Sequence, residues 1–268
     1  MRACGSTAQV ILAGVVSCVL GCFPGGEIME RIRLMLAHPS ILVMAAAVPL
    51  GIGLAAGGPA WVWLFVPLGV LAQMGNEYAL HRFVFHLPPP RRQWAFDLLY
   101  QAHYGHHDFP TNRKLFFAPI WVTVPVLVGN FVLLFGVLAT LGVVYALPIA
   151  AAVVLIGGTA TFLGYEWFHM TAHLDVPKMR AERHVTRLHN QHHFRDFSKW
   201  FHVTPGGAIV DRVMGTAIDR ESLKAQQRIE FIRTLGLRPD DPRLIAARER
   251  FAPRYGLSED EVLRAARG

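Results

Sequence analysis

Long uncharged segments run through much of the chain, and their lengths predict membrane helices. Phe116 to Tyr165 contains no Asp, Glu, Lys or Arg, whereas one transmembrane helix needs about 20 apolar residues. Thr140 to Pro148 is expected to form a turn between two helices, the second of which runs to about Glu166. A second uncharged stretch, Ser40 to Gly75, is divided by the turn signal Gly57-Gly58-Pro59. The pattern therefore predicts four transmembrane helices.

Basic residues flank only one set of the predicted helix ends. The turns at 57–60 and 140–148 carry no charge, whereas the other ends are followed or preceded by Arg31, Arg33, Arg82, Arg91, Arg92, Arg113, Lys114, Lys178, Arg180, Arg183 and Arg187. By the positive-inside rule, the basic ends are expected to be cytosolic. This placement accounts for the net charge of +7 and argues against a nucleic-acid-binding protein, in which basic residues cluster on one face of a soluble domain.

Composition agrees with this division into a membrane part and two flanking parts. Hydrophobic residues make up 53% of the chain and charged residues 17%, against about 25% charged in ordinary soluble domains. We expect a leader or peripheral helix over 1–38, a membrane domain over 39–218 and a cytosolic helical tail over 219–268. Asp241-Pro242 and the capping box from Ser258 to Glu261 predict short amphipathic helices in the tail.

The leader contains an apolar run from Ala8 to Phe23 and all three cysteines, Cys4, Cys18 and Cys22. This run loosely resembles a signal or lipoprotein cleavage segment. A peripheral helix, or a true start at Met29, are the other interpretations. No disulfide framework or thiolate metal site is predicted for the rest of the chain.

Ten of the thirteen histidines fall into four tight groups beside the predicted cytosolic helix ends. The groups are His81 and His86; His103, His106 and His107; His169 and His173; and His189, His192 and His193. Side chains three or four residues apart share one face of a helix, whereas the five-residue spacing of His81 and His86 implies a helix end or kink. So many imidazoles in one place require a cation, because each ring has two nitrogens to satisfy and protonated rings repel. The pattern predicts a metal site.

The number and type of ligands narrow the choice of metal. Neutral imidazole suits zinc, copper, iron and nickel. A zinc ion usually takes four ligands, so ten histidines indicate two ions with about five ligands each, a number that favours iron. The H-E-x-x-H signature of zinc hydrolases is absent, because Arg82 follows His81. Redox chemistry on a lipid is therefore the preferred interpretation.

Five motifs, in order, resemble the fatty acid hydroxylase superfamily, most closely its fatty acid 2-hydroxylase branch. They are Glu77-Tyr-Ala-Leu-His-Arg-Phe-Val-Phe-His86, His103-Tyr-Gly-His-His107, Tyr165-Glu-Trp-Phe-His-Met-Thr-Ala-His173, Leu188-His-Asn-Gln-His-His193, and Phe201-His-Val-Thr-Pro205 leading to Asp211-Arg-Val-Met-Gly-Thr216. The spacings H-x4-H, H-x2-H-H, H-x3-H and H-x2-H-H match the ten-histidine pattern of that branch. The resemblance implies an all-α integral membrane protein, a four-helix transmembrane bundle whose cytosolic helical cap carries a dimetal site.

The same resemblance implies a mechanism and its components. The ten histidines would hold two iron ions, for which zinc can substitute in a purified protein, and dioxygen would be the co-substrate. The expected reaction is hydroxylation of an acyl chain near its carboxyl end, on a lipid substrate in the membrane. Because no haem-b domain precedes the motifs in this sequence, electrons are expected from a separate haem-b carrier or a ferredoxin with its reductase. Composition leans towards a bacterial inner membrane.

Four residues near the motifs are expected to surround and orient the ligands: Glu77, Tyr165, Glu166 and Asp196. Carboxylates commonly accept the free N–H of a metal-bound imidazole. Glu166 stands where many family members have Asp. His202 stands where many have Gly; it could add a hydrogen-bond donor around the ligands, but it is expected to face solvent. His38 and His184 fall outside the spacing and are not expected to be ligands.

Two other functions are compatible with the sequence. One is a carotenoid or sterol hydroxylase or desaturase of the same superfamily, which would differ in the shape of its pocket. The other is a non-catalytic metal-binding protein or transporter. Transporters place ligands near the bilayer midplane, whereas all four histidine groups here lie at helix ends, which disfavours transport.

Overall fold

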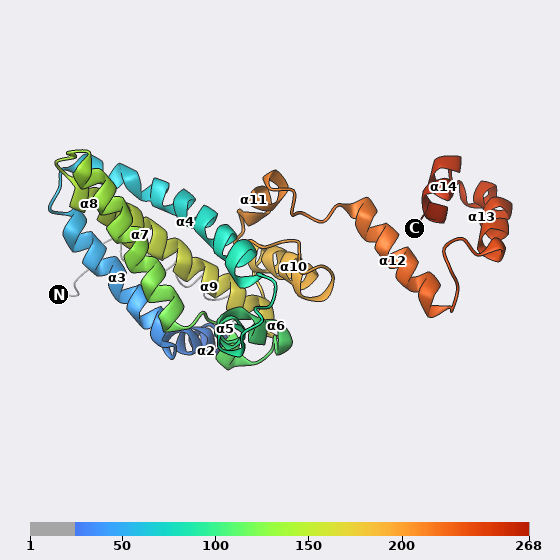
Figure 1. Ribbon diagram of the computed structural model, residues 1–268, viewed down its shortest axis with the longest axis horizontal. Coiled ribbons are helices and arrows are strands. Elements are labelled where there is room, and N and C mark those ends of the chain that lie inside the picture. The colour runs from blue at the N-terminus through green and yellow to red at the C-terminus, as the bar shows by residue number, and fades with distance from the viewer. Residues whose placement is uncertain (1–24, 268) are drawn as a thin grey trace, which may run out of the picture. The chain divides into compact units, whose positions relative to one another are not determined.

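The computed structural model describes residues 25–267, all of whose regular elements are helices (Figure 1). The predicted leader therefore lies largely outside the described residues. The chain divides into two compact units, with the boundary between Thr216 and Ala217. The first unit contains every predicted histidine ligand, and the second contains the tail.

In its described part, residues 25–216, the first unit has α-helices, short 3₁₀ helices and three π-helical segments. Its α-helices are α2 (Gly25–Leu36), α3 (Pro39–Ala55), α4 (Val66–Leu80), α5 (Gln93–Leu99), α6 (Gly105–Asp108), α7 (Ile120–Thr140), α8 (Ala146–Ala150), α9 (Thr159–His173), α10 (Arg180–Phe194) and α11 (Gly207–Val213). The 3₁₀ helices are η1 (Ala60–Phe65) and η4 (Arg113–Leu115). The π segments are η2 (His81–Phe85), η3 (Tyr100–Tyr104) and η5 (Ala151–Gly158).

Within residues 25–267, two helices are long and apolar enough to cross a membrane: Arg113–Thr140 and Ala146–His173. The pair Glu27–Leu36 and Pro39–Ala55 is bent by 89° and would count as a third span if taken together. Both expected turns are present, since α3 ends at Ala55 and α7 at Thr140. The remaining expected span, the second along the chain, corresponds to η1 and the 15-residue helix α4. The count of four spans therefore stays a prediction.

The helix that contains α9 continues beyond its expected end near Glu166. It ends at His173, so that His169 and His173 lie on its last two turns rather than on a following loop. The helix is therefore about two turns longer than expected, and it continues past Glu166 because the carboxylate is buried within the protein.

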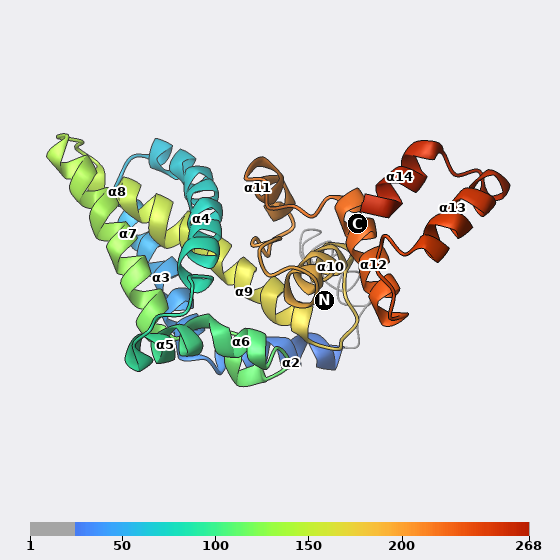
Figure 2. The same cartoon turned by 45° about the vertical axis from the view of Figure 1, so that its right-hand side comes forward.

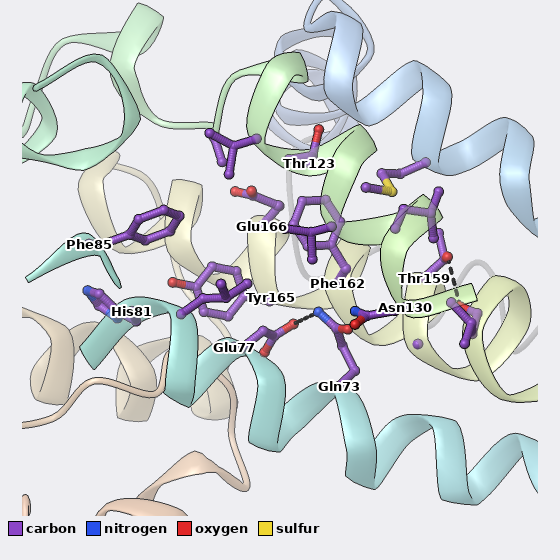
Figure 3. A pocket seen from close by; sticks show the side chains of 18 residues that line it. Gln73, Glu77, His81, Phe85, Thr123, Asn130, Thr159, Phe162, Tyr165 and Glu166 are labelled. Carbon is purple, nitrogen blue, oxygen red and sulfur yellow. Dashed lines mark hydrogen bonds between the residues drawn. The ribbon is translucent and has the colours of Figure 1, made fainter. Parts of the chain in front are cut away.

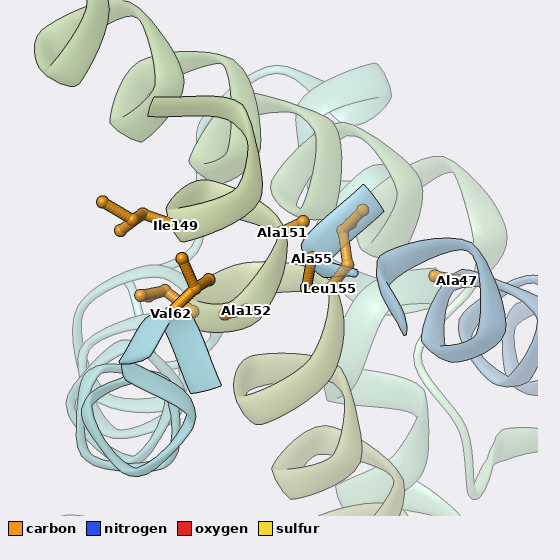
Figure 4. Close-up of a cluster of buried hydrophobic side chains, with 8 residues drawn as sticks. Ala47, Ala55, Val62, Ile149, Ala151, Ala152 and Leu155 are labelled. Carbon is orange, nitrogen blue, oxygen red and sulfur yellow. The ribbon is translucent and has the colours of Figure 1, made fainter. Parts of the chain in front are cut away.

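The central helix of the first unit, formed by α8, η5 and α9, packs against its neighbours through glycines. A Cβ atom at Gly69 of α4 would lie 2.0 Å from the carbonyl oxygen of Val153, and one at Gly157 would lie 2.2 Å from that of Val66. A Cβ at Gly51 of α3 would lie 2.6 Å from the Leu155 side chain. Small residues let membrane helices approach this closely. Around these contacts lies a core of Ala47, Ala55, Val62, Ile149, Ala151, Ala152, Val153 and Leu155 (Figure 4).

A buried ion pair ties the start of the unit to α10. Arg31 of α2 lies 3.3 Å from Glu182, and both side chains are almost completely buried. Glu182 also accepts hydrogen bonds from the Trp167 indole (2.9 Å) and the Met179 amide (2.8 Å). A buried charge pair needs such additional partners to offset desolvation. These contacts fix α10 against α9. The two helices carry the histidines of the third and fourth sequence groups.

The second unit contains three helices: α12 (Arg220–Thr234), α13 (Pro242–Tyr255) and α14 (Glu259–Arg267). Asp241 accepts a hydrogen bond from the Arg243 amide (2.9 Å) at the start of α13. Ser258 and Glu261 form the expected capping box, with the Ser258 amide 2.9 Å from the Glu261 carboxylate. The short helices expected in the tail are therefore present.

Candidate metal centre

The structure brings the ten histidines of the four motifs into two groups of five. Within each group, one ring nitrogen from every histidine lies within 4.8 Å of the others. Group 1 consists of His81, His86, His103, His107 and His192. Group 2 consists of His106, His169, His173, His189 and His193. The two groups are adjacent, because the rings of His107 and His193 stack with centroids 4.1 Å apart.

Two π-helical segments place three ligands of group 1, His81, His86 and His103. In η2 the amide of His86 bonds to the carbonyl of His81 (3.1 Å), five residues earlier. The wider turn puts residues five apart on one face, which explains the H-x4-H spacing that did not fit an α-helix. The segment η3 contains His103 and leads into α6, which carries His106 and His107.

The ring nitrogens of group 1 converge more closely than hydrogen bonding alone can explain. The Nε2 atom of His103 lies 3.1 Å from that of His81, 3.2 Å from that of His86 and 2.8 Å from that of His107. A ring nitrogen can donate or accept one hydrogen bond, so it cannot satisfy three such partners. Nitrogens bound to one ion at about 2.0–2.1 Å are separated by roughly 3 Å. The convergence fits a metal ion.

Group 2 shows the same convergence between α6, α9 and α10. The Nε2 atoms of His106 and His169 lie 2.9 Å apart, and those of His173 and His189 lie 2.8 Å apart. Both ring nitrogens of His193 are buried without a hydrogen-bond partner among the described residues. A cation would satisfy these inward-facing nitrogens, so both groups could hold metal ions.

Burial keeps the imidazoles of group 1 neutral, which is the state that binds metal. Burial lowers the pKa of His86 to about 4. Burial and the neighbouring imidazoles together lower the pKa of His192 to about 3 and that of His107 to about 2. The pKa of His103 is well below its ordinary value for the same two reasons. At neutral pH their lone pairs are therefore available to a cation.

Two outer nitrogens of group 1 bond to a loop over residues 195–206, which we call the carbonyl loop. His81 Nδ1 donates to the carbonyl oxygen of Phe201, and His192 Nδ1 donates to that of Lys199 (2.6 Å). Trp200, between the two carbonyls, has a left-handed backbone (φ 54°), which is unusual for a bulky residue. These bonds fix the ring orientation and the tautomer of both histidines.

Asp211 of α11 holds the carbonyl loop in place. Its carboxylate accepts hydrogen bonds from the amides of Phe201 (2.9 Å) and His202 (3.1 Å) and from the Thr216 hydroxyl (2.7 Å). The residue is completely buried. Asp211 belongs to a motif recognised in the sequence, but no spacing rule could indicate that it positions carbonyl partners of two histidines.

The outer nitrogens of group 2 lack this kind of support. The Nδ1 atoms of His106, His169, His189 and His193 are buried and have no hydrogen-bond partner among the described residues. The nearest carboxylate oxygen to one of them, Glu166 Oε2, lies 3.9 Å from His169 Nδ1. Glu166 therefore lies next to group 2, but at a distance longer than a hydrogen bond.

The other three residues expected to orient the ligands are Glu77, Tyr165 and Asp196, and their contacts differ from one another. Glu77 is buried, accepts a hydrogen bond from Gln73 (3.3 Å) and lies 3.9 Å from His202 Nε2. The Tyr165 ring lies 5.8 Å from that of His169. Asp196 accepts hydrogen bonds from the Ser198 amide (2.9 Å) and hydroxyl (2.5 Å), which stabilises the start of the carbonyl loop.

His202 does not face solvent, so that expectation was wrong. It is only 3% exposed, and its Nδ1 atom accepts a hydrogen bond from the Thr204 amide (3.3 Å). Asp211 fixes the His202 backbone, and the ring packs against Gly207, where a Cβ atom would lie 2.2 Å from it. Neither His38 nor His184 belongs to a histidine group, as expected from their spacing.

An apolar pocket lies beside group 1 (Figure 3). His81, Glu77, Tyr165 and Glu166 line one end of it, and Phe85, Leu80, Val122, Val126 and Phe162 contribute apolar walls. A second cavity, lined by Phe65, Leu68, Leu134, Leu138, Ile149 and Val153 among others, shares Gln73, Asn130, Val154 and Gly158 with the first. The two cavities together extend between α4, α7 and η5, away from the histidines.

Fold and site together define a helical membrane protein with a histidine-rich metal-binding site at the end of an apolar pocket. Comparison with known proteins narrows this class. A model of the fatty acid hydroxylase family matches residues 66–216, more than half of the chain. The chain belongs to the fatty acid hydroxylase family.

Individual relatives agree with this assignment. A dihydroceramide fatty acyl 2-hydroxylase of Arabidopsis thaliana is 32% identical over 155 residues, which are 58% of this chain and 61% of that protein. A fatty acid 2-hydroxylase of Rattus norvegicus is 30% identical over 138 residues, covering 50% of this chain and 34% of the rat protein. Each match spans less than two thirds of the relative's own length.

A solved structure has the same fold. It is described as full-length Scs7p with only the hydroxylase domain visible, and it superposes with a TM-score of 0.57 at 24% identity. The superposition covers 67% of this chain and 66% of that chain. At this level of identity the likeness concerns the fold of the domain.

Proposed function

We propose that this protein is a membrane-bound di-iron oxygenase that hydroxylates a lipid acyl chain near its carboxyl end. The observation that carries the proposal is the convergence of ten imidazoles in two groups of five at the end of an apolar pocket. Membership of the fatty acid hydroxylase family and the names of the relatives support the same reaction. Dioxygen and two external electrons would complete it.

The proposed metal ligands are the ten histidines. Five nitrogen ligands for each ion exceed the four that zinc usually takes, and imidazole is a common ligand of iron. A bound iron pair would supply the activation of dioxygen and the oxidation of an unactivated C–H bond. The protein's part is to hold the ligands neutral and oriented, and to place the acyl chain.

The apolar pocket is the proposed acyl-binding site. Its continuation past Gln73 and Asn130 into the second cavity offers room for a chain beyond the reacting carbon. Apolar walls exclude water from the acyl chain, and burial of its apolar surface favours binding. Glu77, Tyr165 and Glu166 would face the polar end of the substrate, next to His81.

Gly158 lines both cavities, and a Cβ atom there would lie 3.9 Å from the Gln73 side chain of α4, which also lines both. A larger side chain at Gly158 would therefore take up space that the two cavities share. An acyl substrate is proposed rather than a carotenoid or sterol because the relatives are named as fatty acyl and fatty acid 2-hydroxylases.

The proposed orientation places the histidines on the cytosolic side of a four-span bundle, in a bacterial inner membrane. The basic residues that flank the histidine end of the spans support it. A separate haem-b carrier, or a ferredoxin with its reductase, would deliver the electrons.

Comparative lipid mass spectrometry tests the reaction. Membranes from cells that express the wild type are compared with those from cells expressing the His192→Ala, His193→Ala double variant, which removes one ligand from each group. We expect acyl lipids that are heavier by one oxygen atom only with the wild type, and fragmentation would locate the hydroxyl group. Unchanged acyl lipids from a folded, metal-loaded wild type would refute the proposal.

A matched glycine pair tests the acyl channel. Gly158→Leu would obstruct the junction of the two cavities, so we expect products with shorter chains. Gly164→Leu makes the same change on α9 at a site with no neighbouring atom within 4 Å and should leave the product profile unchanged. Identical profiles for the two variants would rule out this path for the chain.

A further inference from the structure

A basic groove lies on the outer face of α10, opposite the histidines of that helix. Lys178, Arg183, Arg187 and Arg195 line it together with polar side chains and Phe194. None of the described residues that line the groove is acidic. Arg183 donates a hydrogen bond to the backbone carbonyl of Lys178 (2.6 Å), a partner that leaves its charge uncompensated.

Basic residues and histidine ligands lie on opposite faces of α10. Arg183, Arg187, Asn190 and Phe194 recur every three or four residues and form one stripe. The opposite stripe contributes the buried residues His189, His192 and His193 to the two histidine groups. We call the outer stripe, with Lys178 and Arg195, the basic face of α10.

The basic face is close to the metal-binding groups. Phe194 is 66% exposed, and its ring lies 5.9 Å from that of His193 of group 2, centroid to centroid. The groove and the histidines are separated by the thickness of one helix, about 10–12 Å with its side chains. A protein seated in the groove would bring a redox centre near the surface within reach of both groups.

We infer that the basic face of α10 is the docking site of an acidic one-electron carrier protein; this inference rests on the proposed function. Hydroxylation of R–H by dioxygen consumes two electrons and two protons and yields R–OH and water. A one-electron carrier must therefore dock twice for each turnover. Clustered positive charge around an exposed aromatic residue attracts such a carrier and speeds its encounter.

The alternative occupant, an anionic membrane surface, fits the basic face less well. A helix that lies in a membrane interface needs a broad apolar face. In α10, as the structure describes it, Phe194 is the one large apolar side chain that is exposed. The helix also follows the end of α9, beyond the bundle formed by α3, α4 and α7 (Figure 2).

Binding and turnover are tested with the full-length protein in nanodiscs of zwitterionic lipid. The probes are two purified acidic carriers, the haem domain of a cytochrome b5 and a plant-type ferredoxin. For the carrier that binds, we expect affinity for the wild type to fall with rising salt. The Arg183→Glu, Arg187→Glu variant should weaken binding on the order of tenfold or more. The Arg91→Glu, Arg92→Glu variant makes the same charge change at two exposed arginines before α5 and should bind like the wild type.

A small-molecule reductant separates docking from catalysis. With reduced methyl viologen in place of the carrier, we expect the Arg183→Glu, Arg187→Glu variant to hydroxylate lipid at the wild-type rate. Equal losses with both electron sources would show damage to the centre and overturn the inference. If the wild type hydroxylates nothing with either source, the proposed function fails, while the binding data still decide the docking site.

A photo-crosslinking residue at Asn190, in the centre of the groove, identifies the occupant directly. With nanodiscs that contain anionic lipid, we expect a covalent adduct of the mass of the carrier. Adducts with lipid alone, binding by neither carrier, or equal carrier binding by both charge-reversal variants would each refute the inference.

Discussion

The two histidine groups have the same number and kind of ligands, but only group 1 is oriented by hydrogen bonds from outside. His81 and His192 each donate an outer N–H to a backbone carbonyl of the carbonyl loop, which Asp211 fixes. Among the described residues, no partner bonds to the outer nitrogen of His107 in group 1 or to four outer nitrogens of group 2. The difference indicates that group 1 is partly oriented before an ion binds, whereas group 2 depends more on the ion itself.

The largest effect is expected from removing one ligand of either group. His103→Ala in group 1 and His106→Ala in group 2 should each lower the metal content from about two ions per chain to about one, because ligand loss opens a single site. Hydroxylation should fall below detection in both. Inductively coupled plasma mass spectrometry of the purified protein measures the metal. Loss of both ions from each variant would mean that the groups do not bind separately.

Removal of the Asp211 carboxylate should weaken group 1 selectively. Asp211→Ala leaves two buried backbone N–H groups unpaired, each costing about 1–3 kcal/mol, and frees the carbonyl loop. We expect metal affinity of group 1 to fall about 10–100-fold, as for other outer partners of ligands. The measurement is made in the His106→Ala background, where the remaining ion reports group 1.

The same substitution in the His103→Ala background is the control, because there the remaining ion reports group 2 and should bind normally. Asp211→Asn keeps one acceptor oxygen and should have an intermediate effect. Equal weakening of both groups would show that Asp211 acts through the general stability of the fold rather than through the carbonyl loop.

A smaller effect is expected from Glu166→Gln, which removes the carboxylate next to group 2. Because Glu166 Oε2 lies 3.9 Å from His169 Nδ1, we expect metal affinity of group 2 to fall less than about tenfold. Titration with a metal chelator in the His103→Ala background measures it. A fall as large as that caused by Asp211→Ala would mean that group 2 is oriented as strongly as group 1.

The smallest effect is expected from Asp196→Ala. Its carboxylate caps Ser198 at the start of the carbonyl loop, so the loss should cost about 1 kcal/mol of stability. Thermal unfolding measures that loss, and metal binding by group 1 should stay within about twofold of the wild type. A marked loss of metal from group 1 would instead support the orienting role suggested by the sequence.

Spacing identified the ten histidines, but it could not divide them between the groups. His106 and His107 are neighbours yet belong to different groups, as do His192 and His193. Successive residues on an α-helix point about 100° apart, so each His-His pair serves two sites. That division becomes apparent only when the positions of α6, α9 and α10 are known.

The features of the site that the sequence did not predict depend on backbone position and tertiary packing rather than on residue type. The carbonyl oxygens of Lys199 and Phe201 have no signature, because every residue carries one. His202 was expected in solvent because burial by Asp211 and Gly207 is a tertiary effect. By contrast, the two expected turns and the capped helix starts of the tail follow from local signals, and they are present.

The π-helical turns at His81–Phe85 and Tyr100–Tyr104 have a consequence for how this protein can change over evolution. Each turn contains one residue more than the α-helical path between the same points. A single-residue deletion within it can be absorbed by reversion to an ordinary α-helical turn, which keeps the following histidine on the same face. An insertion has no such outlet and would rotate the following histidine by about 100°, so insertions between His81 and His86 should be tolerated less well than deletions.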